Sequence, residues 1–141
     1  MCRRNHAFTL IEIMIVVVLM SLLAGMVGLR LIKNADRTKV RIAKTMVNGT
    51  LRQALEQFYL DNHSYPTTDQ GLQALVEKPS IGPEPMDYPE DGYFEVGLDP
   101  WDMPYQYVCP GVHNKNRFDL WSMGPDRQSA TVDDIVNWRS K

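Results

Sequence analysis

A single glutamate stands near the start of a long apolar run in this chain. Glu12 lies in the segment AFTLIEIMIVVVLMSLLAGMVGL, which covers Ala7 to Leu29, and no further charge occurs before the segment ends. A carboxylate at such a depth costs roughly 2.5–3.5 kcal/mol on membrane-insertion scales, so it indicates a function. Two explanations stay open: the carboxylate reaches back to the lipid headgroups, or it pairs with a cation.

The second explanation has a specific cation if the chain is cut after Ala7. This is the small-residue candidate for processing before the run, and a cut there gives Phe8 a free α-amino group. Such an amine is largely cationic at neutral pH, because its usual pKa is about 7.7–8.0. Residues four apart share a helix face, so Glu12 could neutralise the Phe8 amine of its own chain or of a neighbouring copy one step along.

A second group of carboxylates lies near the C-terminus. Asp126, Asp133 and Asp134 stand in the segment GPDRQSATVDDIVNW, with few cations nearby. Calcium binds roughly six to eight oxygens from carboxylates, carbonyls and water, so a loop that brings these residues together would suit it. A solvated polar loop without a metal is the alternative.

The remaining residues form no catalytic set. His6, His63 and His113 are scattered, and the sequence has neither a Gly-x-Ser-x-Gly nucleophile motif nor a phosphate-binding glycine loop. Cys109 is interpreted as a buried, inert thiol, and a disulfide to Cys2 across the apolar run is not expected. We therefore predict that the protein is not an enzyme. A single-pass membrane enzyme with a small catalytic domain is the alternative from another class.

The apolar run is long enough to span a membrane. From Phe8 to Leu29 it would form about 33 Å of helix, whereas a cleaved secretory signal has a shorter apolar core. The basic residues before it place its N-terminal end in the cytoplasm. We predict a cleaved leader at 1–7, a membrane and assembly helix at 8–29, and a soluble domain at 30–141. The net charge of −2, without a basic stripe, argues against nucleic-acid binding.

The helix is predicted to continue past the membrane, from Thr9 to Leu60. In its second half, apolar residues recur at helical spacing and predict one buried stripe: Ile42, Met46, Val47, Leu51, Leu55, Phe58 and Tyr59. A break at Pro66, a short helix over 69–77 and a loop over 78–92 follow. Strand-like runs at 93–97, 104–109 and 117–123 come next. This order predicts an α+β fold in which a small antiparallel sheet covers the stripe.

The segment RRNHAFTLIEIMIVV, Arg3 to Val17, resembles the class III signal of type IV pilins and type II secretion pseudopilins. The resemblance implies a type IV pilin-like fold, cleavage between Ala7 and Phe8 by a prepilin peptidase, and N-methylation of Phe8. It also implies that Glu12 acts in filament assembly. The residue before the cut is usually Gly in this family, and here it is Ala7.

The soluble part resembles the major pseudopilins of type II secretion in the segments LDNHSYPTTDQGLQALVEKP, DPWDMPYQYVCPG and FDLWSMGPD. The resemblance implies a subunit that polymerises into a periplasmic pseudopilus and drives export of folded proteins through the outer membrane. Implied partners are other copies of the chain, minor pseudopilins, the prepilin peptidase, an inner-membrane platform with its assembly ATPase, and the outer-membrane secretin. The implied location is the bacterial inner membrane, crossed once, with the C-terminal domain in the periplasm. A type IV or competence pilin, and a minor pseudopilin, are the alternatives.

In major pseudopilins, the segment that SMGPD matches forms a calcium site. The resemblance implies that Asp126 is a side-chain ligand and Met123 a carbonyl donor, with Asp133 and Asp134 as the acidic cluster that follows. The glycine-rich insert of the family is shortened here to RQSATV. Asp102 and Met103 stand where the family often has Gly-Asn.

Overall fold

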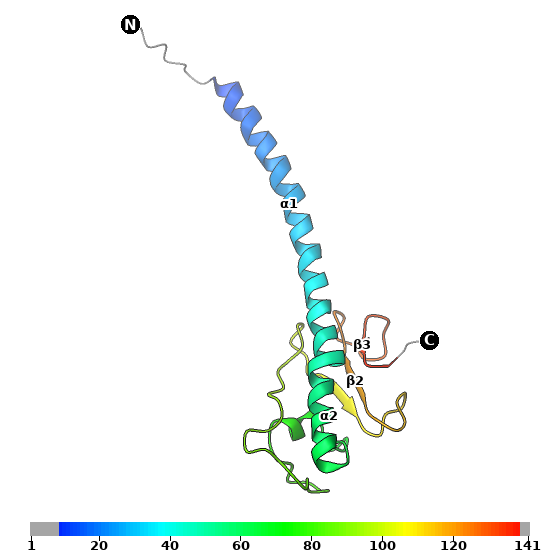
Figure 1. Ribbon diagram of the computed structural model, residues 1–141. Helices are drawn as coiled ribbons and strands as arrows, with labels where there is room; N and C mark the ends of the chain where they lie inside the picture. The colour runs from blue at the N-terminus through cyan, green and yellow to red at the C-terminus, as the bar shows by residue number, and fades with distance from the viewer. Residues whose placement is uncertain (1–8, 139–141) are drawn as a thin grey trace. The chain divides into compact units, whose positions relative to one another are not determined.

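The computed structural model describes residues 9–138, with the side chains of all of these except 25–35. The chain divides into two units, the first ending at Arg37 and the second beginning at Thr38. Three helical segments follow one another: α1 (Leu10–Thr45), the π-helical η1 (Met46–Thr50) and α2 (Leu51–Asn62) (Figure 1). The predicted long helix is confirmed over the described residues. The predicted leader, 1–7, lies outside them.

The described part of the first unit is an exposed helix. Thr9 caps its start, since the Thr9 hydroxyl accepts a 3.3 Å hydrogen bond from the backbone N–H of Glu12. Large apolar side chains lie on its surface, from Leu10, which is 79% exposed, to Leu23, which is 63% exposed. Within the described residues, no helix is sufficiently long and apolar to cross a membrane. The predicted span, 8–29, extends beyond the described side chains at both ends and stays a prediction.

One face of the helix is buried in the second unit. The core residues on this face are Ala43, Val47, Leu51, Ala54, Leu55 and Phe58. Ile42 and Tyr59, which were predicted to lie in the buried stripe, are instead 49% and 41% exposed. Consecutive residues point about 100° apart on a helix, so a face that passes through Ala43 leaves Ile42 outside. The single π turn, where the Leu51 N–H donates to the Met46 carbonyl, was also not predicted.

The segment after α2 begins with a left-handed residue. His63 has a φ of 56°, and its N–H donates to the Tyr59 carbonyl at 2.7 Å, which ends the helix. The helix predicted over 69–77 is a shorter 3-10 helix, η2 (Leu72–Leu75). Before it, Thr67 and Gln70 each donate a backbone N–H to the other's side-chain oxygen. This reciprocal pair has the form of a capping box and fixes the turn that leads into η2.

The sheet has three antiparallel strands in the order β1 (Gln106–Val108), β2 (Asp119–Ser122) and β3 (Ile135–Val136). Tyr107 pairs with Leu120 across β1 and β2, and Trp121 pairs with Val136 across β2 and β3. The strands predicted within 104–109 and 117–123 are confirmed with narrower bounds. The third strand, β3, was not predicted because it has only two residues.

The run at 93–97 is not a strand, and this prediction was wrong. The backbone N–H groups of Tyr93 and Phe94 both donate to the carbonyl of Leu75, at 2.7 and 3.0 Å. These bonds tie the run to the end of η2 instead of to the sheet. The predicted loop over 78–92 is confirmed, since no helix or strand occurs between η2 and β1.

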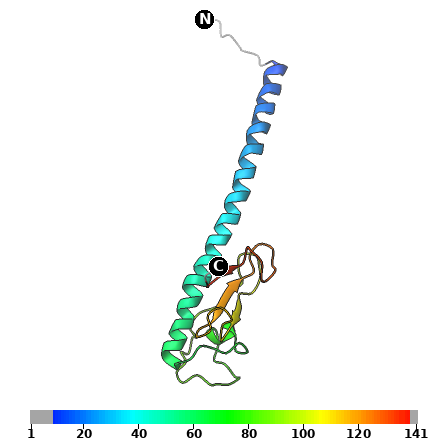
Figure 2. The same cartoon turned by 90° about the vertical axis from the view of Figure 1, so that its right-hand side faces the viewer.

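The core of the second unit lies between the helix and the sheet. The π-helical η1 contacts both β2 and β3, and the sheet lies along the helix (Figure 2). Buried side chains on the sheet side are Trp101, Tyr105, Phe118, Leu120 and Ile135. The predicted α+β arrangement, with a small antiparallel sheet against the helical stripe, is confirmed.

Candidate functional site

Glu12, the predicted assembly residue, lies in the first turn of α1 and is exposed. Its backbone N–H donates hydrogen bonds to Thr9. Among residues 9–138, its carboxylate has no hydrogen-bond or ion-pair partner. The order Thr9-Leu-Ile-Glu12 is itself a helix-start signal, in which a threonine is followed three residues later by a glutamate. Ala7 and Phe8 lie outside the described residues, so cleavage between them and the pairing of Glu12 with the Phe8 amine stay predictions.

The acidic C-terminal segment folds back on itself between β2 and β3. The backbone N–H of Asp126 donates to the carboxylate of Asp133 at 3.2 Å. Gly124, with a φ of 67°, permits this approach, because a Cβ at that position would collide with the Asp133 carbonyl oxygen. Met123 immediately precedes this glycine. The loop therefore brings the Asp133 carboxylate to the backbone of Asp126.

Thr131 holds the acidic residues of this loop in place. Its hydroxyl oxygen lies 2.8 Å from Asp133 Oδ1 and 3.3 Å from Asp134 Oδ1. A hydroxyl has one proton, so the shorter contact is the bond it donates. This bond from Thr131 holds the pKa of Asp133 below its ordinary value. This role of Thr131 was not predicted from the sequence.

The three carboxylates of the loop do not converge on one point. Asp134 Oδ2 accepts the backbone N–H of Ala130 at 2.8 Å, and Asp126 Oδ1 accepts that of Gln128 at 2.9 Å. Across residues 9–138, no group of three or more His, Cys, Asp or Glu side chains is placed to hold one metal ion. A calcium ion here would therefore need carbonyl and water oxygens beside the carboxylates, which is within its usual ligand set. Calcium binding stays a prediction.

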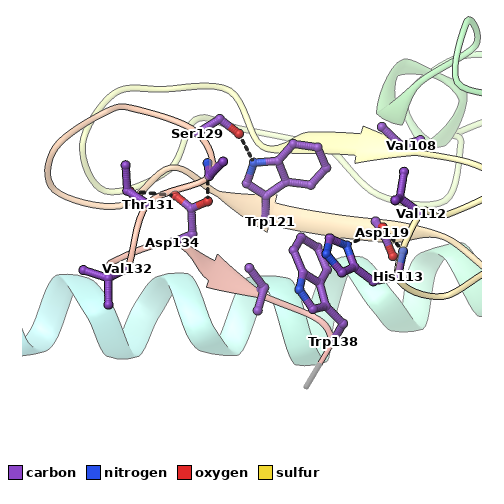
Figure 3. Close-up of a pocket in the computed structure, with 12 residues that line it drawn as sticks. Val108, Val112, His113, Asp119, Trp121, Ser129, Thr131, Val132, Asp134 and Trp138 are labelled. Atoms are coloured by element: carbon purple, nitrogen blue, oxygen red, sulfur yellow. Dashed lines mark hydrogen bonds and ion pairs between the residues drawn. The ribbon is translucent and has the colours of Figure 1, made fainter. Parts of the chain in front are cut away.

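A buried carboxylate orders the turn between β1 and β2. Asp119, only 2% exposed, accepts the backbone N–H groups of His113 and Asn114 at 2.8 and 3.0 Å. The His113 ring nitrogen Nδ1 lies 3.0 Å from the same carboxylate. Burial raises the pKa of Asp119, but these hydrogen bonds outweigh it and lower the pKa below its ordinary value. The role of Asp119 in this turn (Figure 3) was not predicted from the sequence.

Comparison with known proteins finds a family match at each end of the chain. The family described as Type II secretion system (T2SS), protein G matches residues 30–138, and the prokaryotic N-terminal methylation motif matches residues 2–28. The type II secretion system core protein G of Pseudomonas aeruginosa is 44% identical over 140 residues, covering 96% of each chain. That of Vibrio cholerae is 43% identical over 140 residues, covering 96% of this chain and 93% of the other.

A solved structure agrees with the sequence comparison. The crystal structure of the major pseudopilin from the type 2 secretion system of enterohaemorrhagic Escherichia coli is similar, with a TM-score of 0.68 and 41% sequence identity. The similarity covers 77% of this chain and 89% of that one. The family model matches residues 30–138, which include the helix from residue 30 onward, the sheet and the acidic loop. The chain therefore belongs to the type II secretion system protein G family and is a pseudopilus subunit.

Proposed function

We propose that copies of the chain polymerise through their N-terminal helices, with Glu12 of one copy paired with the Phe8 amine of the next. The observation that carries this proposal is the exposed apolar surface of α1 from Leu10 to Leu23. Glu12 is the only charged residue between Leu10 and Ala24. An apolar surface of this extent must be covered by lipid or by other helices, and a carboxylate within it needs a cation.

The same proposal includes the route by which the chain reaches the filament. A prepilin peptidase cuts between Ala7 and Phe8, Phe8 is N-methylated, and the helix at 8–29 anchors the chain once in the inner membrane. The domain from residue 30 onward lies in the periplasm. Minor pseudopilins, the inner-membrane platform, the assembly ATPase and the outer-membrane secretin are the further partners. The match of residues 2–28 to the methylation motif supports the processing step. The proposed role is structural and needs no catalytic residue.

Replacing Glu12 tests this proposal in the full-length chain. Glu12→Gln keeps the size of the side chain but removes the charge that neutralises the amine, so the chain should be inserted and cut but should not form filaments. Thr9→Val is the matched control, because it removes the capping hydroxyl, at a cost of about 1 kcal/mol to the helix, and keeps the carboxylate. Electron microscopy counts filaments, and mass spectrometry of the N-terminus reports processing. Normal filaments from Glu12→Gln would contradict the proposal.

We also propose that calcium binds the acidic loop. Asp126 and Asp133, already joined by a 3.2 Å hydrogen bond, would supply carboxylate oxygens, and Asp134 would assist from the adjacent position. The Met123 carbonyl and water would complete the set. Each carboxylate oxygen can accept two bonds, so the hydrogen bonds within the loop leave capacity for a cation. Bound calcium would supply positive charge that holds the loop closed.

A further inference from the structure

A cluster of cations follows the apolar run directly. Residues 30–44 contain six cations and one carboxylate, a formal charge of +5, from +6 − 1. Residues 45–141 contain seven cations and fifteen carboxylates, a formal charge of −8, from +7 − 15. Cations ordinarily gather on the cytoplasmic side of a membrane segment, where this chain has only Arg3 and Arg4. The proposed orientation therefore does not explain the cluster, and its charge indicates a contact of another kind.

Three of these cations occupy one face of α1 in the first unit. Because α1 is an unbroken helix from Leu10 to Thr45, successive residues turn by about 100°. Measured from Arg30, Lys33 lies about 60° around the helix and Arg37 about 20° in the same direction, so the three positions share an arc of about 60°. We call Arg30, Lys33 and Arg37 the basic stripe.

Arg37 is the member of the basic stripe whose side chain the structure describes, and it is exposed. The ion pairs found among the described side chains join other residues, and none of them includes Arg37. Its neighbour Asp36 lies about 100° away around the helix and does not pair with it. The guanidinium of Arg37 is therefore available to an external anion, and its planar shape suits the oxygens of a phosphate group.

The basic stripe lies at the depth of the lipid headgroups when the helix at 8–29 spans the bilayer. The headgroup region adds roughly 5–7 Å on each side of a hydrocarbon core of about 30 Å. At a rise of 1.5 Å per residue, Arg30 and Lys33 lie about 1.5 and 6 Å beyond Leu29, and Arg37 about 12 Å. The Debye length at physiological ionic strength is about 8 Å, so Arg37 lies within reach of the surface charge.

We propose that the basic stripe binds the phosphate groups of anionic phospholipids in the periplasmic leaflet of the inner membrane. This inference rests on the single-pass anchor proposed above and names the ligand at the outer end of that anchor. An anionic surface attracts the stripe and repels the net charge of −8 on residues 45–141, so the stripe is the part of the periplasmic chain that contacts lipid. The span holds the stripe at the headgroups before a second copy is present, which favours lipid over the carboxylates of a neighbouring copy.

The lipid selectivity of the full-length chain in vesicles tests this contact. The chain is reconstituted in phosphatidylcholine vesicles that contain a trace of spin-labelled phosphatidylglycerol or of spin-labelled phosphatidylcholine. Electron spin resonance gives the association constant of each labelled lipid with the protein. We expect the constant for phosphatidylglycerol to be roughly fivefold the larger, the factor for one cation beside one anionic lipid. In about 1 M salt the Debye length falls to about 3 Å, and the ratio should approach one.

Two variants with the same change in net charge locate the contact. The test variant replaces the stripe with glutamine: Arg30→Gln, Lys33→Gln and Arg37→Gln. The control variant removes three exposed cations farther along α1: Lys39→Gln, Arg41→Gln and Lys44→Gln. The control positions lie about 15–22 Å beyond Leu29, outside the headgroup region. The test variant should bring the ratio of the two constants close to one, and the control variant should leave the ratio unchanged.

Three outcomes would overturn the inference. The first is equal constants for the two lipids in the unsubstituted chain, and the second is an equal loss of selectivity in both variants. The third is a test variant that keeps its lipid selectivity but loses filaments, which would assign the stripe to a contact between copies. Flotation of the same vesicles reports the anchor separately. A chain that does not float with them would contradict the anchor in the proposed function and this inference with it.

Discussion

The backbone N–H of Asp126 is joined to the carboxylate of Asp133 by a 3.2 Å hydrogen bond that closes the loop between β2 and β3. Gly124 makes the approach possible, and Thr131 holds Asp133 from the other side at 2.8 Å. The loop is therefore ordered by contacts of its own. Calcium, if it binds as proposed, adds to an arrangement that the chain already favours.

Calcium is expected to raise the thermal stability of the purified full-length chain relative to chelator. A ligand that binds only the folded state stabilises it by about 2.7 kcal/mol at 100 times its dissociation constant, which moves the midpoint by several degrees. Asp126→Ala should abolish the shift. Asp69→Ala, an exposed carboxylate outside the loop, is the matched control and should retain it. Equal midpoints with calcium and with chelator would contradict calcium binding.

Thr131→Val should raise the pKa of Asp133 toward its usual value of 3.8, since the hydroxyl bond is the main reason that this pKa is low. A carboxyl group with a lowered pKa in the folded state stabilises the fold above its usual pKa, and that contribution disappears as the pH falls through the folded value. The variant should therefore show a weaker loss of stability with acid. Carboxyl titration by NMR measures the shift. An unchanged Asp133 pKa would show that Thr131 does not hold this carboxylate.

Asp119→Asn should lower the free energy of unfolding by roughly 1–3 kcal/mol at neutral pH, because it disrupts buried bonds to the N–H groups of His113 and Asn114. The folded pKa of Asp119 is below its usual 3.8, so the difference from the native chain should shrink as the pH falls below that value. Urea denaturation at several pH values measures it. A difference that stays constant down to acid pH would contradict the proposed role of the charge.

Asp102→Gly is expected to stabilise the chain by several tenths of a kcal/mol. Asp102 has a φ of 65°, a left-handed conformation that costs a residue with a side chain roughly 1–2 kcal/mol, while glycine loses roughly 0.5–1 kcal/mol of backbone entropy on folding. Asp102→Ala should destabilise it, because alanine tolerates this conformation less well. The thermal midpoints of the two variants test this explanation. Equal changes in midpoint for Asp102→Gly and Asp102→Ala would contradict it.

The helix and the order of the elements could be predicted from the sequence, because they depend on local patterns. A long apolar run continues into apolar residues at helical spacing, and Pro66 marks the end of the helix. The exact buried face could not be predicted in this way. Ile42 is a better core residue than Ala43 by hydrophobicity alone, yet Ala43 is buried, because the contact with the sheet decides which side of the helix faces inward.

The strand assignments show the same limit. The run at 93–97 has strand-like composition, but its N–H groups bond to Leu75, and a two-residue strand at Ile135 completes the sheet instead. Long-range hydrogen bonds decide which run forms a strand, and the amino-acid composition of a run does not predict those bonds. In the acidic loop the aspartates were visible in the sequence. The role of Thr131 was not, since its contacts depend on how the loop closes.

In the proposed filament, Glu12 of one copy neutralises the Phe8 amine of its neighbour. The most direct measurement is a cryo-electron microscopy structure of filaments assembled from the full-length, processed chain. We expect the Glu12 carboxylate to lie within roughly 4 Å of the Phe8 nitrogen of an adjacent copy, the range of a direct ion pair. Filaments in which Glu12 faces lipid, or pairs only within its own chain, would contradict it.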